Sequence, residues 1–307
     1  MLNEGLPYIS SPQFWQIMSC RASMYLVWQG HMAKPQPRPC GLGAGSGRFK
    51  SWLFDWWRTT GFSESARLGG GKYFCVEADE YDSAFFDKSV LQSSFTIIQK
   101  LAILNNLEFD HADIFDDLFA IQKQFHHLVR TIPSEGRIIA PITESNIDEV
   151  LTQGCWTPVV RTSLEPNDQA ALSAELISAD GSHFNVNWYG QSIGEVKWNM
   201  TGQHSVANAL TTIAAAQHVG VTIEQACEAL SNFGGVKRRM ELLGTVRGIE
   251  VYDDFAHHPT AIETTLDGAR KRLGERKLWA IVSHALIPCV WAAIKMVWHT
   301  LHDWPMK

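Results

Sequence analysis

The strongest constraint on the fold comes from two short apolar runs, each of which leads into acidic side chains. The first run, Tyr73–Val76, is followed by the acidic stretch Glu77–Asp82. The second run, Leu101–Leu104, is followed shortly by Asp110 and His111. Apolar runs of this length are typical of strands that are buried on both faces of a parallel sheet. The sequence therefore predicts an open α/β sheet in which both runs end at the same edge.

Helical and extended patterns alternate along the rest of the chain. We expect helices over 114–129, 204–218 and 223–231, and a last helix from Pro259 onward. We expect strands at Arg137–Ala140, in a hairpin region over 167–200, and in the pair Glu241–Val246 and Ile249–Tyr252. This alternation predicts an α/β fold with a mostly parallel central sheet flanked by helices.

The chain divides near Gly234-Gly235, a glycine pair suited to a hinge. We expect a central domain over 13–233 and part of a second α/β domain over 236–307. Residues 20–62 stand apart, because neither a helical nor a strand period is present there. We expect this stretch to be disordered or mispacked within the central domain.

Composition excludes several classes of protein. Hydrophobic residues make up 45% and charged residues 19% of the chain, which is ordinary for a globular protein. The net charge of -6 gives no reason to expect nucleic acid as a partner. A long uncharged apolar run and an export signal are both missing from the sequence, so we expect a cytoplasmic protein that does not span a membrane. The 6 cysteines form no CxxC pair, which favours reduced thiols over zinc or disulfides.

The two strand-end clusters suggest a metal site. Ligands of open α/β sheets bind beyond the carboxyl ends of the strands. That rule brings Glu77, Asp79, Glu80, Asp110 and His111 toward one crevice. Carboxylate oxygens there suit Mg²⁺ beside a phosphate. The alternative for each cluster alone is a solvated acidic turn.

A second polar segment, Tyr252–Thr260, precedes the last expected helix. It contains Asp253, Asp254, His257 and His258. Acids and histidines ahead of a helix N-terminus can contact phosphate, metal or substrate. The alternative is a helix cap with a hydrogen-bonded histidine.

Five motifs occur along the chain in a fixed order. They are EADEYDSAFFDK (Glu77–Lys88), NNLEFDHADIF (Asn105–Phe115), GQHSVANALTTIAAA (Gly202–Ala216), KRRMELLG (Lys237–Gly244) and YDDFAHHPTAI (Tyr252–Ile262). In this order they resemble the Mur ligase family of cytoplasmic, ATP-dependent enzymes that join an amino acid or peptide to a cell-wall precursor. The resemblance covers about residues 1–12 and 66–280, and it implies that 1–12 are a remnant of an N-terminal domain.

The resemblance implies a role for each matching residue. Glu77 matches the acid that binds Mg²⁺, and His111 matches the histidine that helps to hold a second metal. Asn208 matches the residue that faces the adenine. Arg239 matches the arginine that reaches the ATP phosphates, and Asp253 matches an acid at the nucleotide.

His257 and His258 belong to the same loop as Asp253. We group them with Arg239 as candidates for the catalytic set. One departure is Ser205, because the family usually has asparagine after the histidine of this motif.

The resemblance also implies a reaction and its partners. The motifs are most similar to those of the family members that add a peptide. In such enzymes ATP phosphorylates the lactyl carboxylate of UDP-N-acetylmuramate, and the amine of L-alanyl-γ-D-glutamyl-meso-diaminopimelate attacks the acyl phosphate. ATP and Mg²⁺ are the implied cofactors, and small molecules are the implied partners. L-Alanine stays open as the alternative acceptor.

The family's phosphate loop, GTHGKT, is missing from the sequence. At its expected place stands Gly30–Pro39, in which Pro35, Pro37 and Pro39 lack the backbone N–H groups that a phosphate cradle needs. Lys34 lies in this stretch, but its surroundings exclude it as the catalytic lysine.

Codon arithmetic suggests why the loop is missing. Read from the third base of Gly30, codons with free third bases permit Thr-His-Gly-Lys-Thr-Thr-Thr-Thr-Ser, the family's loop. Phe54–Thr59 read from the second base permits Leu-Ile-Gly-Gly-Val-Pro, another family-like string. Val282–Ala292 read from the third base permits Glu-Pro-Arg-Ser-Asn-Thr-Met-Arg-Met-Gly, which resembles a C-terminal motif. We infer frameshifts around 20–62 and after about 282, with 89–100 as a weaker third case.

Three functional hypotheses follow. The first is the ligase that the family resemblance implies. The second is a catalytically dead remnant without a phosphate loop, and we expect the chain as written to be inactive. The third is a non-catalytic binding module that docks a partner without nucleotide.

Overall fold

The structure is a computed structural model, and it describes residues 73–77, 100–109, 115–256 and 259–281. It also gives the backbone of three further strands, Met24–Gln29, Trp52–Phe54 and Ala66–Arg67. The loop expected to replace the phosphate cradle, the weaker frameshift patch and the residues after 281 lie outside the described part. The inferred frameshifts therefore stay a prediction.

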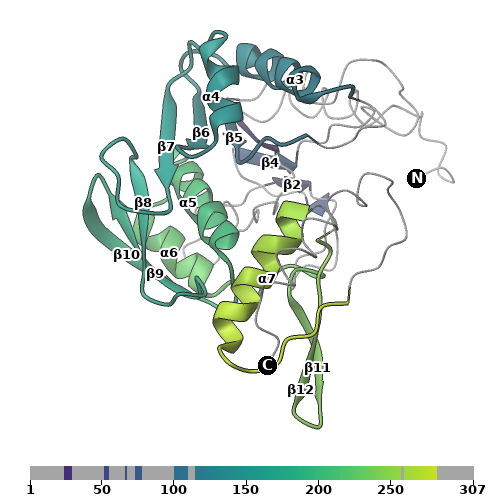
Figure 1. The fold of residues 1–307 in the computed structure, drawn as a ribbon. Coiled ribbons are helices and arrows are strands. Elements are labelled where there is room, and N and C mark those ends of the chain that lie inside the picture. Colours follow the sequence, from purple (N-terminus) through teal and green to yellow (C-terminus); the bar gives the residue numbers. More distant parts are fainter. Residues whose placement is uncertain are drawn as a thin grey trace, which may run out of the picture.

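One large sheet organises the central region (Figure 1). Its strands are β1 Met24–Gln29, β2 Trp52–Phe54, β3 Ala66–Arg67, β4 Tyr73–Glu77, β5 Leu101–Leu104, β6 Arg137–Pro141, β7 Val159–Ser163, β8 Leu172–Leu176, β9 His183–Trp188 and β10 Gln191–Lys197. Among the described residues their order is β10-β9-β8-β7-β6-β5-β1-β4-β2-β3. The strands from β8 to β2 in this order run parallel, while β9, β10 and β3 are antiparallel to their neighbours. The expected mostly parallel α/β sheet is confirmed.

In the described part of the chain, four helices cover the two faces of this sheet. They are α3 Leu118–Thr131, α4 Ser145–Thr152, α5 Gln203–His218 and α6 Ile223–Ser231. Successive residues of β5 belong to opposite cores: Leu101 and Ile103 pack with α5 and α6, while Ala102 and Leu104 pack with α3 and α4. Both cores consist of buried apolar side chains, which explains why β5 needs an apolar residue at every position.

Local chemistry sets the ends of the helices. Asp117 caps α3 by accepting a hydrogen bond from the Ala120 backbone N–H at 2.8 Å. Thr222 and Gln225 form a reciprocal capping box at the start of α6. These caps place the start of α3 a few residues later than the sequence pattern suggests.

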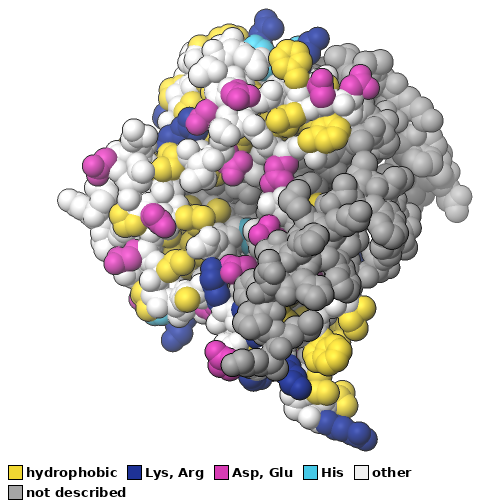
Figure 2. Space-filling model, in the orientation of Figure 1, with side chains coloured by type: hydrophobic (Ala, Val, Ile, Leu, Met, Phe, Trp, Pro, Cys, Tyr) yellow, Lys and Arg dark blue, Asp and Glu magenta, His cyan; other side chains and the backbone are white. Residues whose placement is uncertain are grey.

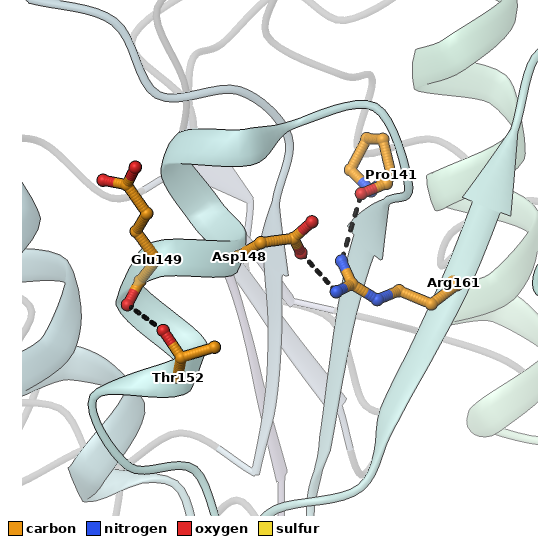
Figure 3. Close-up of polar contacts among 5 residues, drawn as sticks. All are labelled: Pro141, Asp148, Glu149, Thr152 and Arg161. Atoms are coloured by element: carbon orange, nitrogen blue, oxygen red, sulfur yellow. Dashed lines mark hydrogen bonds and ion pairs between the residues drawn. The ribbon is translucent and has the colours of Figure 1, made fainter.

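A partly buried arginine joins α4 to the sheet (Figure 3). Arg161 on β7 donates to the Pro141 carbonyl at the end of β6 with an N–O distance of 3.1 Å, and it pairs with Asp148 on α4. Thr152 closes the same helix by donating to the Glu149 carbonyl. The sequence analysis does not anticipate α4 or β7, because each is short and carries few apolar residues.

The C-terminal unit is smaller. It consists of the antiparallel hairpin β11 Glu241–Val246 and β12 Ile249–Asp253, followed by helix α7 Pro259–Leu273. Figure 1 shows the hairpin projecting away from the sheet, with α7 between the hairpin and α5. The strand pair and the helix from Pro259 are as expected.

Two backbone strands fall within residues 20–62, where the sequence pattern predicts none. Backbone strands at Met24–Gln29 and Trp52–Phe54 lie inside this stretch, and β1 pairs with both β4 and β5. The apolar run Tyr25–Trp28 suits a strand with neighbours on both sides, where polar alternation is not required. Because this run lacks polar alternation, the sequence pattern did not predict the strand β1.

Candidate nucleotide site

The register of the sheet aligns the strand ends that carry candidate residues. Glu77 ends β4 opposite Trp28, and Leu104 ends β5 opposite Gln29, so both strands end beside the end of β1. Strands in a sheet lie about 4.8 Å apart, so the backbones of Glu77 and Leu104 are roughly 10 Å from one another. The described part includes neither the Glu77 side chain nor His111.

A buried amide pair links the β5 strand end to α5. Asn105, the residue after β5, donates from Nδ2 to Oδ1 of Asn208 at 2.6 Å. Each of the two residues is only 8% exposed. The Oδ1 atom of Asn105 is buried and has no hydrogen-bond partner among the described residues. The candidate adenine residue, Asn208, is therefore held by the strand-end loop.

The start of α5 has an unusual backbone. Gly202 caps the helix with φ of 90°, a left-handed value that favours glycine. Ser205 donates to the Thr201 carbonyl at 2.8 Å. The hydroxyl at the position where the family usually has asparagine is thus engaged within its own helix turn.

His204 connects α5 to the C-terminal unit electrostatically. Burial, and secondly the positive charge of Arg239, lower the pKa of His204 to about 4. The ring is therefore neutral near pH 7. Because the effect of Arg239 reaches His204, the arginine expected at the ATP phosphates faces the helix that carries Asn208.

Arg238, the neighbour of Arg239, forms an ion pair with Asp253 at 3.3 Å. Arg238 also stacks over the Phe255 ring at 4.8 Å from its centroid. Its backbone φ is 57°, so the segment turns sharply before β11. This pairing fixes Asp253 at the end of β12, beside the Arg239 segment.

Asp254 anchors the same turn. Its two carboxylate oxygens accept from the backbone N–H groups of Met240 and Ala256, each at 2.8 Å. Asp254, which the sequence analysis named only as part of a polar loop, therefore holds the backbone of this turn in place. Its neighbour Asp253 pairs with Arg238, and its place at the nucleotide stays a prediction.

Helix α7 docks directly on the strand-end loop. Thr260 Oγ1 donates to Oε2 of Glu108 at 2.8 Å, joining the first turn of α7 to the loop after β5. At the other end of α7, Arg272 donates to the Asn199 carbonyl at 2.7 Å. His257 and His258 lie outside the described residues, but they immediately precede this docked turn.

Glycines bring α7 against α5 between these two bonds. A Cβ atom on Gly268 would lie 2.8 Å from both Cα and N of Gly202. Such a separation is too short for any side chain larger than hydrogen. The C-terminal unit therefore meets the central region at the start of α5, the helix that carries Asn208.

Two carboxylates, those of Glu108 and Glu144, lie near one another beside the loop after β5. Glu144, ahead of α4, has its pKa raised by burial and then by the charge of nearby Glu108. The described residues hold no group of three or more acids, histidines or cysteines that could bind a metal. The metal pair expected from the sequence, Glu77 and His111, therefore stays a prediction.

Sequence reasoning anticipates some of this site and misses other parts. It names Asn208, Arg239 and Asp253, which lie on elements that meet. It does not name Asn105, Arg238 or Thr260 as partners, although all three fall inside the quoted motifs. Their roles depend on contacts between segments far apart in the chain, which a motif string does not encode.

The cysteines and the helices bear on what composition predicts. Cys75 and Cys227 are buried. Burial, and secondly the charge of Glu224, raises the pKa of the Cys227 thiol to about 12. No helix in the described part is long and apolar enough to cross a bilayer.

Comparison with known proteins follows the same two regions. Residues 65–216 match the Mur ligase middle domain, and residues 238–286 match the Mur ligase glutamate ligase domain. A protein of Haemophilus influenzae, UDP-N-acetylmuramate–L-alanyl-γ-D-glutamyl-meso-2,6-diaminoheptandioate ligase, is 51% identical over 214 residues. That match covers 69% of this chain and 46% of the relative, so the chain spans about half the length of this relative.

Solved structures give the same relationship. A murein peptide ligase from Psychrobacter arcticus is 42% identical with a TM-score of 0.69, covering 94% of this chain and 63% of its own. The UDP-N-acetylmuramate:L-alanyl-γ-D-glutamyl-meso-diaminopimelate ligase of Neisseria meningitidis is 39% identical with a TM-score of 0.63, covering 77% of this chain and 74% of its own. The strand order, the α5–α7 joint and these matches lead to one conclusion: the chain belongs to the Mur ligase family.

Proposed function

We propose that the chain derives from an ATP-dependent amide ligase that joins UDP-N-acetylmuramate to L-alanyl-γ-D-glutamyl-meso-diaminopimelate. It carries the part of that enzyme that handles the nucleotide. The observation that carries the proposal is the contact between the loop after β5, α5 and α7, made by the Asn105–Asn208 and Thr260–Glu108 bonds. This contact joins the central region to the C-terminal unit where open α/β sheets bind ligands.

The residues present fit an adenine nucleotide. Asn105 Oδ1 is a buried acceptor without a partner in the described part, and such an atom costs free energy until a donor reaches it. Asn208 would face the base. Arg239 would approach the phosphates from the C-terminal unit, because its charge already acts on His204 at the start of α5. Asp253 would stay beside it through its pairing with Arg238.

Glu77 and His111 would hold Mg²⁺, which when bound offsets negative charge on a transferring phosphoryl group. A carboxylate at the end of β4 is suited to this hard cation. Arg239 would contribute positive charge to the same group from the opposite side. His257 and His258, just ahead of α7, would lie next to the substrate when the two units close.

The acceptor is proposed to be the tripeptide. The motifs of this chain are most similar to those of the peptide-adding members, and L-alanine is the alternative. The implied partners are small molecules, and the implied location is the cytoplasm. The proposal includes no nucleic acid or membrane.

A second candidate is favoured by a different observation. Gly30–Pro39 has three prolines where a phosphate loop needs backbone donors. For the polypeptide as written we propose a catalytically inactive remnant, which retains the base side of the site but not the triphosphate cradle.

The test compares the chain with one matched variant. In the variant, His31–Pro39 is replaced by Thr-His-Gly-Lys-Thr-Thr-Thr-Thr-Ser. Isothermal titration calorimetry would measure ATP affinity for both proteins. We expect the restored loop to tighten ATP binding at least about tenfold, because a cradle adds backbone N–H groups and a lysine at the phosphates.

Turnover then separates the candidates. The unmodified chain is incubated with ATP, Mg²⁺, UDP-N-acetylmuramate and either the tripeptide or L-alanine, and ADP release is measured. Turnover would refute the inactive-remnant proposal, and the preferred acceptor would identify the substrate. Unchanged ATP affinity in the restored variant would contradict descent from a phosphate-loop ligase.

A further inference from the structure

The Asn105–Asn208 pair carries an inference that deepens the proposed function and rests on it. Asn105 follows β5 at the ligand-binding edge of the sheet, and Asn208 lies in the second turn of α5. They are 103 positions apart in sequence, so the 2.6 Å bond between them exists only in the folded chain. The bond is buried, and each residue is more than nine-tenths shielded from solvent.

The direction of this bond fixes the orientation of both amides. Asn105 donates through Nδ2, so Oδ1 of Asn208 is turned toward Asn105 and Nδ2 of Asn208 points the other way. The Asn105 amide is planar, and its Oδ1 atom lies opposite the engaged nitrogen. That atom is buried and has no partner in the described part of the chain.

We propose that Asn105 is a specificity-determining residue for a 6-aminopurine base. Its Nδ2 group positions Asn208, and its Oδ1 atom accepts a hydrogen bond from the exocyclic amine. Asparagine amides suit adenine because the base presents an amine donor next to a ring-nitrogen acceptor. Guanine has a carbonyl oxygen in place of that amine, so Asn105 Oδ1 would face another acceptor.

The surroundings support a ligand at this point of the chain. The loop that begins with Asn105 also contains Glu108, which accepts from Thr260 of the C-terminal unit. Asn105 is thus at the boundary between the two units, where a bound base would contact both. A purely structural asparagine at this depth would be expected to satisfy both amide atoms within the protein.

The experiment measures base preference with nucleosides, so it does not depend on a phosphate loop. Saturation-transfer-difference NMR would give the affinities of the full chain for adenosine and guanosine. We expect the unmodified chain to prefer adenosine by about tenfold. Asn105→Ala removes both amide atoms, and we expect it to reduce that preference to about twofold or less.

Asn105→Asp tests whether Asn105 positions Asn208, and it leaves the volume of the side chain nearly unchanged. Aspartate has no Nδ2 donor, so it accepts from Asn208 and turns that amide around. The carboxylate still offers an oxygen to the exocyclic amine, but the turned Asn208 amide no longer presents its Nδ2 group in the same direction. We therefore expect the adenosine preference to fall only partly, whereas a residue that merely fills space would be replaced without effect. Its similar size also keeps the test valid if the alanine variant does not fold.

Asn146→Ala is the matched control. Asn146 Nδ2 donates to the Leu107 carbonyl at 2.7 Å, so it supports the same loop without touching Asn208. We expect it to keep the adenosine preference. An adenosine preference in Asn105→Asp as strong as that of the unmodified chain, or an equal loss of preference in Asn146→Ala, would overturn the inference alone. An unmodified chain that binds neither nucleoside would overturn the proposed adenine site, and the inference with it.

Discussion

The central sheet and the C-terminal hairpin bury their apolar residues to opposite degrees. Every residue of β5 is buried, and Leu101, Ile103 and Leu104 are 0% exposed. In the hairpin, Leu243 is 62% and Ile249 67% exposed. Figure 2 shows hydrophobic side chains along this projecting hairpin. A two-stranded hairpin cannot shield both of its faces by itself.

This difference separates two physical roles. Stability resides in the central region, where helices cover both faces of the sheet. The C-terminal unit is attached through α7 and the Arg238–Asp254 turn, so its position depends on a few polar bonds and one glycine contact. Substitutions should therefore unfold the protein when made in the first region and shift domain docking when made at the joint.

The largest effect is expected from truncating a buried leucine of the central region, and an exposed leucine of the hairpin is the comparison. Leu210 on α5 is fully buried, and Leu210→Ala should lower the free energy of unfolding by about 3 kcal/mol through lost burial and a cavity. Leu243→Ala on the hairpin should change it by less than about 0.5 kcal/mol. Urea denaturation followed by circular dichroism measures both. Equal losses would contradict the division of roles.

The next effect concerns pH and His204. Its pKa is about 4 when folded, against an ordinary value of 6.5, so the unfolded chain binds more protons between these values. The contribution of neutral His204 is complete above about pH 6.5 and is lost as pH falls toward 4, by roughly 3 kcal/mol. His204→Gln should flatten this part of the pH–stability curve relative to the unmodified chain.

Arg239→Gln sharpens the same measurement. Burial is the larger cause of the low pKa, so removing the arginine charge should raise the pKa of His204 only partly. NMR titration of the imidazole would show the shift. An unchanged His204 titration would mean that the C-terminal unit does not face α5 in solution.

A smaller effect is expected at the glycine contact. Gly268→Ala would bring a methyl group within 2.8 Å of the Gly202 backbone. Because this clash must move α7 away from α5, we expect the packing of α7 to lose about 2 kcal/mol of free energy. The control is Gly244→Ala in the hairpin, where an added Cβ would meet no atom of the described residues within 4 Å. Hydrogen exchange should accelerate in α7 for the first variant. Similar exchange in both variants would argue against this contact.

The smallest effect should come from Thr260→Val. The variant removes a hydroxyl that donates to Glu108, a bond worth about 1 kcal/mol. Thr264→Val, one turn later on α7, removes only bonds within the helix and serves as the comparison. Faster exchange in the first turn of α7 should be specific to Thr260→Val, and its absence would place the joint elsewhere.

Prediction from sequence succeeded where burial imposes a pattern. The runs at β4 and β5, the helix pattern of α5, and the β11–β12 pair all follow from apolar spacing or turn residues. Helix α4 was missed because only Ile147 and Val150 are buried in its short span. β1 was missed because the surrounding prolines and glycines obscured a run of four apolar residues.

The candidate site was less predictable than the fold. Strand-end position and family motifs indicated Asn208, Arg239 and Asp253. The amide bond from Asn105 and the ion pair that gives Asp253 to Arg238 required three-dimensional contacts. Arg238 and Arg239 are adjacent in one motif, so spacing alone does not indicate that Arg238 pairs with Asp253.

The central claim is that the β5 strand end, α5 and the Arg239 segment surround one nucleotide. Paramagnetic broadening by Mn²⁺ and ATP in millimolar amounts tests this directly in an amide-resolved NMR spectrum. The amide signals of Asn105, Asn208 and Arg239 should broaden together, while that of Thr152 at the far end of α4 should be unaffected. Broadening at only one of the three, or a uniform loss across the spectrum, would contradict it.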